Sequence, residues 1–378
     1  MKKKLFFWAP LLSHVGTIDA VLNSSRSLNK FGKYDIYVLD HFGVFKNHLA
    51  LEDDIKILNI FNISNKLPST GIFSKILIYL ISFLSIPHLF YYMKKYKPDI
   101  FIINLVGIIP LALKSLLSRN CIFINSIQGY PKFNFLRTFL WRIFYKKSNL
   151  VITMTNLSKE KIASSINLDI NKIVKVNNPV IYRKIKLLSK EYIEEEYQEI
   201  FLKYFSIVAI GRLTRQKNFI ALLRVINRIN LEVVNKNFFL FIIGTGELKN
   251  ELQNYIIKNN IKNIRLLGFK KNPYKYLAKA KLFISSSLWE DPGHALIEAC
   301  YLNIPVLTSN CPSGPKENFI HNYNSYVYNM NDENDLFKKL NKIVQNEELS
   351  KKSILINAKK LSREYTFFNY YKSMRKYL

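Results

Sequence analysis

The sequence predicts an α/β protein that contains two doubly wound parallel-sheet domains. A chain of 378 residues is long enough for two domains that each bury their own hydrophobic core. In both halves, short apolar runs typical of buried strands alternate with segments of helical apolar spacing. Near residue 290, a turn with paired carboxylates follows one such apolar run and precedes another. Turns of this kind, at the ends of parallel strands, are where α/β domains bind ligands.

The N-terminal half opens with a βαβ pattern. Residues 5–9 are predicted to form a strand, residues 17–31 a helix that ends at Gly32, and residues 35–39 the next strand. The first ten residues imitate a signal peptide, but the apolar run is too short before Pro10 and no small-residue cleavage site follows. We expect further strands at residues 98–104 and 149–154, and one that starts at residue 121.

An almost wholly apolar stretch of 18 residues, 76–93, is long enough for a membrane-spanning helix to be considered. Pro87 and His88 in its last third argue against a span. We expect one helix that lies partly in the core and partly against a membrane surface. A helix that belongs wholly to a soluble core remains the alternative.

Positive charge is concentrated in the N-terminal half. The whole chain carries 56 Lys and Arg against 27 Asp and Glu, and the span from Lys94 to Lys147 has ten cations and one acid, Asp99. Residues 133–147 mix aromatic and basic side chains, which is typical of basic amphipathic helices on anionic membranes. Two alternatives are a solvated basic face over core aromatics and a compositional bias towards Lys. Because no nucleic-acid-binding module is found, we expect no nucleic acid as a partner.

The C-terminal half repeats the alternation of strands and helices. A charged, solvent-facing linker helix is expected at residues 187–203, and a basic helical tail at residues 354–378. Strands are expected at residues 205–211, 238–244, 264–268, 281–287 and 304–308, with helices at residues 219–229, 272–280 and 294–303.

The turn near residue 290 combines two carboxylates with a helix N-terminus. Pro292 and Gly293 end the extended segment and open the helix that follows. The free N–H groups of that helix, near Ala295 and Leu296, would form a site for an anion such as phosphate. Glu290 lies in the turn and Glu298 lies just past the first helical turn, so both acids flank this site. An ordinary βαβ unit with surface acids is the alternative for this stretch alone.

Two further motifs accompany this turn. Residues 211–218 read Gly-Arg-Leu-Thr-Arg-Gln-Lys-Asn, and residues 241–248 read Phe-Ile-Ile-Gly-Thr-Gly-Glu-Leu. Together with two Glu residues eight apart, they resemble the G-R-x4-K-N, G-x-G-x-L and E-x7-E elements of retaining glycosyltransferases of family 4, which have the GT-B fold. The three motifs occur in the family's order over about 110 residues, and the resemblance is weaker in the N-terminal half.

The resemblance implies two Rossmann-like domains that face each other across a cleft. Residues 1–180 would bind the acceptor, residues 181–360 would bind a nucleotide sugar, and a helix at residues 361–378 would cross back to the first domain. In the catalytic roles, Glu290 would contact the donor sugar while Arg212 and Lys217 clamp its diphosphate. The implied donor-binding residues are Gly16, Gln128, Gly211, Gly244, Gly268, Phe269, Pro292, Gly293, His294, Ala295, Leu296 and Glu298, the last through the ribose hydroxyls.

The sequence departs from the family pattern at two positions. Where the family usually has a pair of glycines in the first strand–helix loop, this chain has only Gly16 after Ser13, His14 and Val15. Where many relatives have a His that touches the donor sugar, this chain has Gln128. An amide can form hydrogen bonds with the sugar but cannot titrate, so a proton-transfer role at this position is excluded.

The expected chemistry needs preorganised positive charge and no cofactor. Breaking the bond between sugar and phosphate builds negative charge on the diphosphate, which fixed cations and N–H donors stabilise. Arg212 can clamp two phosphate oxygens while Lys217 acts as a point charge. Because no Asp-x-Asp motif lies in a suitable loop, we expect transfer without a metal. The three cysteines have no spacing typical of metal sites or disulfides, which fits a reduced, cytoplasmic setting.

The resulting expectation is a retaining glycosyltransferase that is peripherally associated with the inner face of the cell membrane. Its donor would be a UDP-sugar, with GDP as the second choice. Its acceptor would be a lipid-linked saccharide or surface glycan, as in lipopolysaccharide, capsule or exopolysaccharide biosynthesis. The alternative is a non-catalytic protein on a GT-B scaffold that binds anionic lipid or nucleic acid, although such a protein would not need Arg212, Lys217, Glu290 and Glu298 together.

Overall fold

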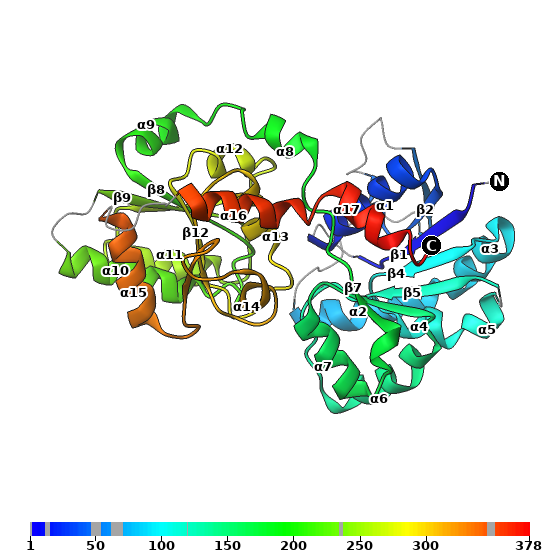
Figure 1. The fold of residues 1–378 in the computed structure, drawn as a ribbon. Coiled ribbons are helices and arrows are strands. Elements are labelled where there is room, and N and C mark those ends of the chain that lie inside the picture. Colours follow the sequence, from blue (N-terminus) through cyan, green and yellow to red (C-terminus); the bar gives the residue numbers. More distant parts are fainter. Residues whose placement is uncertain are drawn as a thin grey trace. The chain divides into compact units, whose positions relative to one another are not determined.

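The computed structural model describes residues 2–11, 16–46, 54–61, 71–118, 120–233, 237–345 and 352–378. They form two compact units (Figure 1). Unit 1 consists of Met1–Pro179 together with Thr366–Leu378, and unit 2 of Val180–Tyr365. Each unit contains one parallel sheet, as the alternation of strand and helix patterns predicts.

Unit 1 is built on a seven-stranded sheet of order β3-β2-β1-β4-β5-β6-β7. The chain winds outward from β1 in both directions, which defines a doubly wound sheet. Its strands are β1 (Lys4–Trp8), β2 (Asp35–Asp40), β3 (Ile55–Asn59), β4 (Ile100–Ile103), β5 (Ile122–Ser126), β6 (Leu150–Thr153) and β7 (Ile173–Lys175). Its helices are α1 (Gly16–Gly32), α2 (Gly71–Leu84), α3 (Ile86–Tyr96), α4 (Ile108–Ala112), α5 (Lys114–Leu117), α6 (Phe135–Phe144), α7 (Asn156–Ile166) and α17 (Phe367–Met374).

The apolar stretch at residues 76–93 is not one helix, so that expectation is wrong. It divides at Ser85 into the end of α2 and the start of α3. Pro87 explains the break, because it has no N–H to donate to the carbonyl of Phe83 and its ring crowds the preceding turn. Within the described residues, no single helix is long and apolar enough to cross a membrane. The segments Ile76–Leu84 and Ile86–Tyr96 pass that test only as a pair, bent by 48°.

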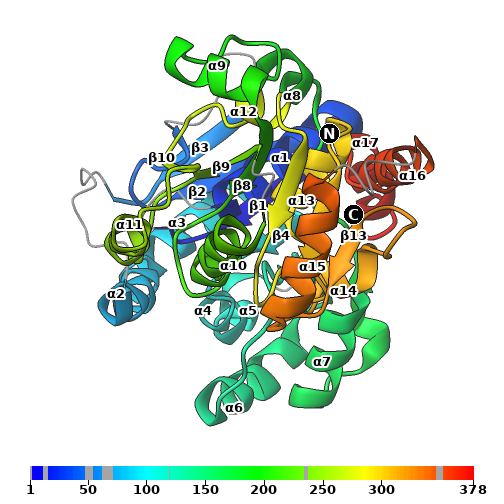
Figure 2. The ribbon, with the colours of Figure 1, turned by 90° about the vertical axis from the view of Figure 1, so that its left-hand side faces the viewer.

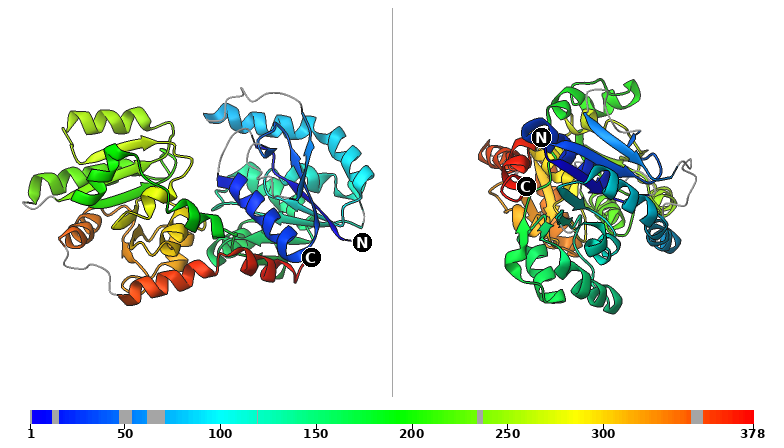
Figure 3. Two further views of the ribbon diagram at one scale, coloured as in Figure 1. Left: turned by 90° about the horizontal axis from the view of Figure 1, so that it is seen from above. Right: turned by 90° about the vertical axis from the view of Figure 1, so that its right-hand side faces the viewer.

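The C-terminal tail is also two helices where the sequence suggests one. The helix α16 (Lys352–Arg363) belongs to unit 2, and α17 starts anew after Thr366, whose hydroxyl accepts from the amide of Asn369. In unit 1, α17 packs along α1 (Figure 3), with the ring of Phe368 edge-on to Phe31 at 5.4 Å. Met374 is fully buried there, so the end of the chain completes the core of unit 1.

Unit 2 is built on a six-stranded sheet of order β10-β9-β8-β11-β12-β13. Its strands are β8 (Phe205–Ile210), β9 (Phe238–Ile243), β10 (Ile264–Gly268), β11 (Leu282–Ser285), β12 (Val306–Ser309) and β13 (Tyr326–Tyr328). Its helices are α8 (Arg183–Leu188), α9 (Glu195–Lys203), α10 (Phe219–Glu232), α11 (Lys249–Lys258), α12 (Tyr274–Leu277), α13 (His294–Tyr301), α14 (Gly314–Asn318), α15 (Glu333–Val344) and α16. Helices α10, α11 and α15 cover one face, and α9, α12 and α13 contribute to the core on the other (Figure 2).

The expected solvent-facing helix at residues 187–203 is wrong. The structure has two short helices, α8 and α9, and both are anchored to unit 2. Phe201 stacks on Phe241 with ring centroids 4.5 Å apart, and Ile193 is buried between the helices. Glu194 accepts a hydrogen bond from the hydroxyl of Tyr276 and pairs with Lys270 at 3.0 Å. The many charged residues of this segment give no indication in the sequence that Ile193 and Phe201 are buried.

The entry to unit 2 and its exit are joined by backbone hydrogen bonds. The amides of Val180 and Ile181 both donate to the carbonyl of Tyr365 at 2.9 Å. The side chain of Tyr365 is fully buried in the core of unit 2. The first and last residues of this unit are therefore held together.

Candidate active site

The predicted residues of unit 2 follow the carboxyl ends of four neighbouring strands. Arg212 and Lys217 follow β8, Gly244 follows β9, Gly268 ends β10, and Glu290 follows β11. The strands on one side of β8 are β9 and β10, whereas those on the other side are β11, β12 and β13. The winding direction therefore reverses between β8 and β11. Such a reversal is the position where doubly wound sheets bind their ligands.

An ion pair joins the loops on the two sides of this reversal. The ammonium of Lys217 contacts Oε1 of Glu290, and the same oxygen accepts a hydrogen bond from the hydroxyl of Ser287 at 2.6 Å. Glu290 is only 7% exposed, so its charge is largely shielded from water. The hydroxyl of Ser286 donates to the carbonyl of Lys217 at 2.8 Å, which fixes the backbone of the β8 loop. The structure thus brings the Lys of one motif and the first Glu of another together.

The turn that carries Glu290 is held by the segment after β12. The amide of Glu290 donates to the carbonyl of Pro312, and the amides of Ser313 and Gly314 donate to the carbonyl of Glu290, all at 2.9 Å. A Cβ atom at Gly314 would lie 2.1 Å from the carbonyl oxygen of Pro292, so only glycine fits this approach. The backbone around Glu290 is consequently fixed from two directions.

Gly244 allows the loops after β8 and β9 to touch. Its φ is +145°, and a Cβ atom there would lie 1.9 Å from the carbonyl oxygen of Gly211. The amide of Gly211 donates to Ile243 at 3.0 Å, and the amide of Leu213 donates to Thr245 at 2.8 Å. Any larger residue at position 244 would push the Gly211 loop, and with it Arg212, out of place.

Helix α13 places Glu298 one turn beyond its start. The helix begins at His294 after Gly293, whose φ of +95° suits glycine. Ala295 and Leu296 lie in its first turn, where the backbone N–H groups have no helical acceptor. The carboxylate of Glu298 accepts a hydrogen bond from the hydroxyl of Tyr274 at 3.0 Å. Tyr274 is therefore a supporting residue that the sequence motifs do not reveal.

Arg212 and Phe269 are the exposed members of the predicted set. Arg212 is exposed in the β8 loop, and no ion pair of its guanidinium occurs within the described residues. Phe269 follows Gly268 and exposes most of its ring. The loop after Phe269 is anchored by the pair of Lys270 with Glu194 and by the hydrogen bonds of Asn272 to Glu191 and to the carbonyl of Leu188.

The two remaining predicted residues, Gly16 and Gln128, belong to unit 1. Gly16 begins α1, while Ser13, His14 and Val15 lie outside the described residues. The amide nitrogen of Gln128 donates to Ser126 at 2.8 Å and to Asn104 at 3.3 Å. Its oxygen accepts from Asn178 at 2.8 Å. Gln128 thereby links the carboxyl ends of β4 and β5 to the last residues of the N-terminal segment of unit 1.

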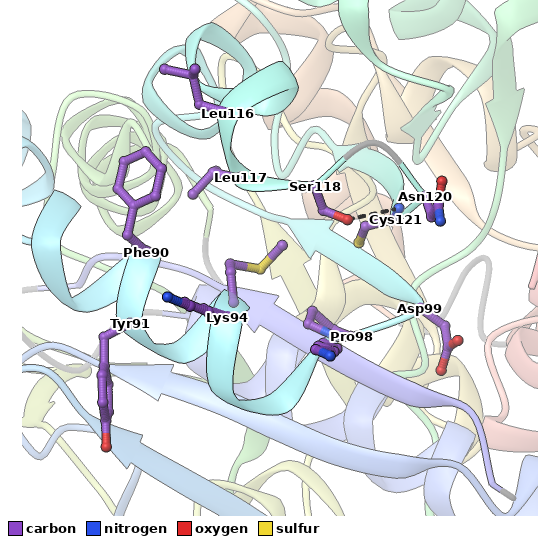
Figure 4. Close-up of a pocket in the computed structure, with 12 residues that line it drawn as sticks. Phe90, Tyr91, Lys94, Pro98, Asp99, Leu116, Leu117, Ser118, Asn120 and Cys121 are labelled. Atoms are coloured by element: carbon purple, nitrogen blue, oxygen red, sulfur yellow. Dashed lines mark hydrogen bonds between the residues drawn. The ribbon is translucent and has the colours of Figure 1, made fainter.

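A cavity of about 580 Å³ lies elsewhere in unit 1 (Figure 4). It is formed by the end of α3, the start of β4 and the segment from α5 to β5. Lys94 and Lys97 line it together with apolar side chains such as Phe90 and Leu116. It lies at the amino ends of β4 and β5, whereas Gln128 lies beyond their carboxyl ends. None of the predicted site residues lines this cavity.

The sequence motifs missed the residues that hold the site together. Ser286 and Ser287 fix Lys217 and Glu290, and Gln216 donates from its side chain to the carbonyl of Trp289 at 2.8 Å. The polar run Ser285-Ser-Ser287 directly after an apolar strand is the one signal that could have indicated them. Among the described residues, no group of three or more His, Cys, Asp or Glu side chains could hold a metal ion.

Comparison with known protein families identifies the motif-bearing unit. Residues 193–360 match the family model described as "Glycosyl transferases group 1". The chain is 36% identical over 239 residues to an uncharacterized glycosyltransferase of Methanocaldococcus jannaschii, a match that covers 59% of this chain and 58% of that protein. It is 28% identical over 226 residues to the N-acetylgalactosamine-N,N'-diacetylbacillosaminyl-diphospho-undecaprenol 4-alpha-N-acetylgalactosaminyltransferase of Campylobacter jejuni, covering 59% of each. The matches therefore span a little under three fifths of these relatives.

The fold of this chain also matches the folds of solved structures of other proteins. The crystal structure of the Anabaena protein HepE in complex with UDP aligns with a TM-score of 0.76, although the identity is only 14%. The alignment covers 100% of this chain and 99% of that one. This likeness confirms the predicted GT-B fold with its two parallel α/β sheets.

Proposed function

Because residues 193–360 match the model of the glycosyl transferases group 1 family, we propose that the chain is a retaining glycosyltransferase that uses a nucleotide sugar. The observation that carries the proposal is the contact between Lys217 and Glu290 where the sheet of unit 2 reverses its winding. This contact joins two separate motifs at the position where such sheets bind nucleotides.

The proposed roles follow from charge and placement. Arg212 and Lys217 would bind the diphosphate and stabilise the negative charge that grows on it as the sugar leaves. The first-turn amides of α13 would add N–H donors to the same group. Glu298 would accept hydrogen bonds from the ribose, and Glu290 would bind a sugar hydroxyl or favour the developing positive charge of the ring. No step of this proposal requires a metal ion.

We infer that the donor is a UDP-sugar and that the acceptor is a lipid-linked saccharide. HepE, which has the same fold, was solved with UDP. The Campylobacter relative carries a diphospho-undecaprenol acceptor in its name. An acceptor of this kind would place the protein at the cytoplasmic face of an anionic membrane, within lipopolysaccharide, capsule or other surface-glycan assembly. A GDP-sugar is the second candidate for the donor.

A nucleotide-sugar panel tests the proposal. Calorimetry with UDP, GDP, UMP and GMP should give clearly tighter binding for one diphosphate than for its monophosphate, because the cations of the β8 loop act on the diphosphate. NMR of the sugar released or transferred from the preferred donor should show that the anomeric configuration is retained. If no nucleoside diphosphate binds and no nucleotide sugar is hydrolysed or transferred, the enzyme proposal is rejected. The alternative of a non-catalytic lipid- or nucleic-acid-binding protein is then favoured.

A further inference from the structure

Helix α6 exposes an apolar stripe. Phe135 is 89% exposed and Leu136 is 63% exposed, and Phe139 and Ile143 are also open to solvent. Leu136, Phe139 and Ile143 follow Phe135 by one, four and eight residues, which places all four side chains on one side of the helix. None of the residues of α6 is fully buried. A row of large apolar side chains that faces water along an entire helix indicates a surface that something else covers.

Aromatic contacts fix which way α6 faces. Trp141 stacks on Tyr145 with ring centroids 4.3 Å apart and meets Phe133 edge-on at 5.5 Å. Arg137 lies over Trp141 and donates to the carbonyl of Lys132 at 2.6 Å. Arg137 and Trp141 are only partly exposed, so these contacts hold one side of α6 against its neighbours. The exposed side of α6 carries the apolar stripe together with Arg142.

Helix α2 exposes a second stripe of the same kind. Phe83 is 63% exposed, and Ile76, Tyr79, Leu80 and Leu84 are exposed at helical spacing beside it. Tyr79 of α2 and Tyr145, which directly follows α6, are close enough to interact electrostatically. Burial is the main cause that raises the pKa of Tyr145, and the nearby Tyr79 hydroxyl adds to that rise. We call the exposed stripes of α6 and α2 together the apolar surface.

Cations surround the apolar surface, and acids are almost absent. Lys132, Arg142, Lys146 and Lys147 are exposed around α6. Between residues 55 and 159 the sequence contains one acid, Asp99. A second copy of this chain would bring the same cations against these ones, and like charges repel. A layer with an apolar interior and negatively charged headgroups complements both the stripes and the cations.

We propose that the apolar surface inserts into the headgroup region of a membrane that contains anionic lipid, while the surrounding cations contact the lipid phosphates. The docking rests on the surface alone, and it deepens the proposed function by bringing unit 1 to a lipid-linked acceptor. Insertion of the stripes should give a part of the binding that resists salt, whereas the cations should give a part that salt weakens. The helices would lie in the plane of the membrane surface.

Vesicle flotation with the full chain tests the docking. The vesicles are phosphatidylcholine alone or phosphatidylcholine mixed with phosphatidylglycerol. Phe135→Ser with Phe139→Ser, and separately Leu80→Ser with Phe83→Ser, should each lower binding to the mixed vesicles by about tenfold or more, because exposed apolar side chains supply the insertion. Lys146→Gln with Lys147→Gln should weaken binding at low salt only.

Matched controls come from unit 2. Leu202 and Leu231 are 80% and 78% exposed, so Leu202→Ser with Leu231→Ser removes comparable apolar surface elsewhere. These controls should bind vesicles like the wild type. The proposal is overturned if the stripe variants bind like the controls. The proposal is also overturned if the wild-type protein forms a dimer in the absence of vesicles and the stripe variants are monomeric. The apolar surface would then bind a second copy of the chain.

A second readout separates this proposal from the proposed enzyme activity. Calorimetry with UDP and no vesicles should give the same affinity for the stripe variants and the wild type, because the stripes belong to unit 1 and the nucleotide residues to unit 2. Normal vesicle binding without nucleotide binding would leave the docking intact and reject the enzyme proposal. Nucleotide binding without flotation would reject the docking proposal and leave the enzyme proposal intact.

Discussion

Lys217 and Glu290 lie 73 residues apart in the chain, yet their charged groups form an ion pair between the loops that follow β8 and β11. The pair has little exposure to water, and Ser287 donates a further hydrogen bond to the same carboxylate oxygen. Each residue thus fixes the position of the other at the point where the sheet of unit 2 changes its winding direction. A change in either one should alter both the stability of this unit and its proposed chemistry.

Removal of the cations should slow the proposed transfer. Arg212→Ala and Lys217→Ala should each lower kcat by about 10²–10³, because each removes a preorganised charge from the leaving group. Arg215→Ala is the matched control, since Arg215 is an exposed cation of the same loop outside the motif positions. Steady-state kinetics with the preferred donor measure the effect. Turnover near the wild-type rate in both variants would contradict the diphosphate role.

The ion pair itself can be tested by a double-mutant cycle on stability. Lys217→Met should lower the free energy of unfolding by about 3–5 kcal/mol, because it leaves the shielded carboxylate of Glu290 without its counter-charge. Glu290→Gln combined with Lys217→Met should recover much of this loss. Urea unfolding of the wild type, both single variants and the double variant gives the coupling. Additive effects would show that the two side chains do not interact in solution.

Glu298 should contribute to nucleotide affinity more than to the rate of the bound complex. Glu298→Gln should raise the Kd of UDP by about tenfold, because hydrogen bonds to a charged acceptor are stronger than those to a neutral one. Tyr274→Phe should give a smaller rise, since it removes only the hydroxyl that holds Glu298 in place. Calorimetry checks both, with Glu251→Gln on α11 as the control. An unchanged Kd for Glu298→Gln would remove this residue from the nucleotide site.

Glu194 should make the stability of unit 2 sensitive to acid. Burial raises the pKa of this carboxyl, but hydrogen bonds from Tyr276 and Lys270 outweigh it and hold the pKa at about 2. This pKa is below the ordinary value of 4.5, so the ionised Glu194 stabilises the folded state. Its contribution to stability is complete above about pH 4.5 and is lost as pH falls towards 2. The effect should be modest, since the side chain is partly exposed.

The acid response is measured as the Tm at a series of pH values across this window. In Glu194→Gln the fall in Tm between about pH 4.5 and 2 should be shallower than in the wild type. Glu199→Gln, an exposed acid of α9, should keep the wild-type slope. Parallel curves for all three proteins would mean that Glu194 has the same pKa in the folded and unfolded chains.

Chelation should leave the proposed activity in place. The sequence has no Asp-x-Asp motif in a suitable loop, and cations of the protein are assigned to the diphosphate. Transfer assayed after dialysis against EDTA should therefore proceed at the original rate. A complete loss that Mg²⁺ or Mn²⁺ restores would require a metal in the mechanism.

The motif-bearing strands of unit 2 could be predicted from sequence because they are buried on both faces. The run Phe238–Ile243 is entirely buried, and such runs are apolar without interruption. The ion pair of Lys217 with Glu290 could not be predicted, because the order of the strands decides which loops meet. The contacts of Glu194 were missed for a related reason, since a glutamate on a charged segment gives no sign of a buried partner such as Tyr276.

The facing of α6 was also beyond prediction from the sequence. Both sides of this helix carry large apolar residues, so periodicity cannot decide whether Trp141 or Phe139 points outward. Only the stacking of Trp141 on Tyr145 decides it. The short strand Tyr326–Tyr328 likewise has too few residues to show an alternation.

The carbonyl of Tyr365, which accepts the amides of Val180 and Ile181, has a consequence for the order in which the protein folds during synthesis. Unit 2 is an insertion within unit 1, and its entry and exit meet at this carbonyl. Residues 180–365 leave the ribosome as one uninterrupted segment, whereas unit 1 lacks α17 until the inserted segment has been translated. Tyr370 and Met374 of α17 are buried in the core of unit 1. Unit 1, whose synthesis starts first, is therefore the last to have its complete sequence outside the ribosome.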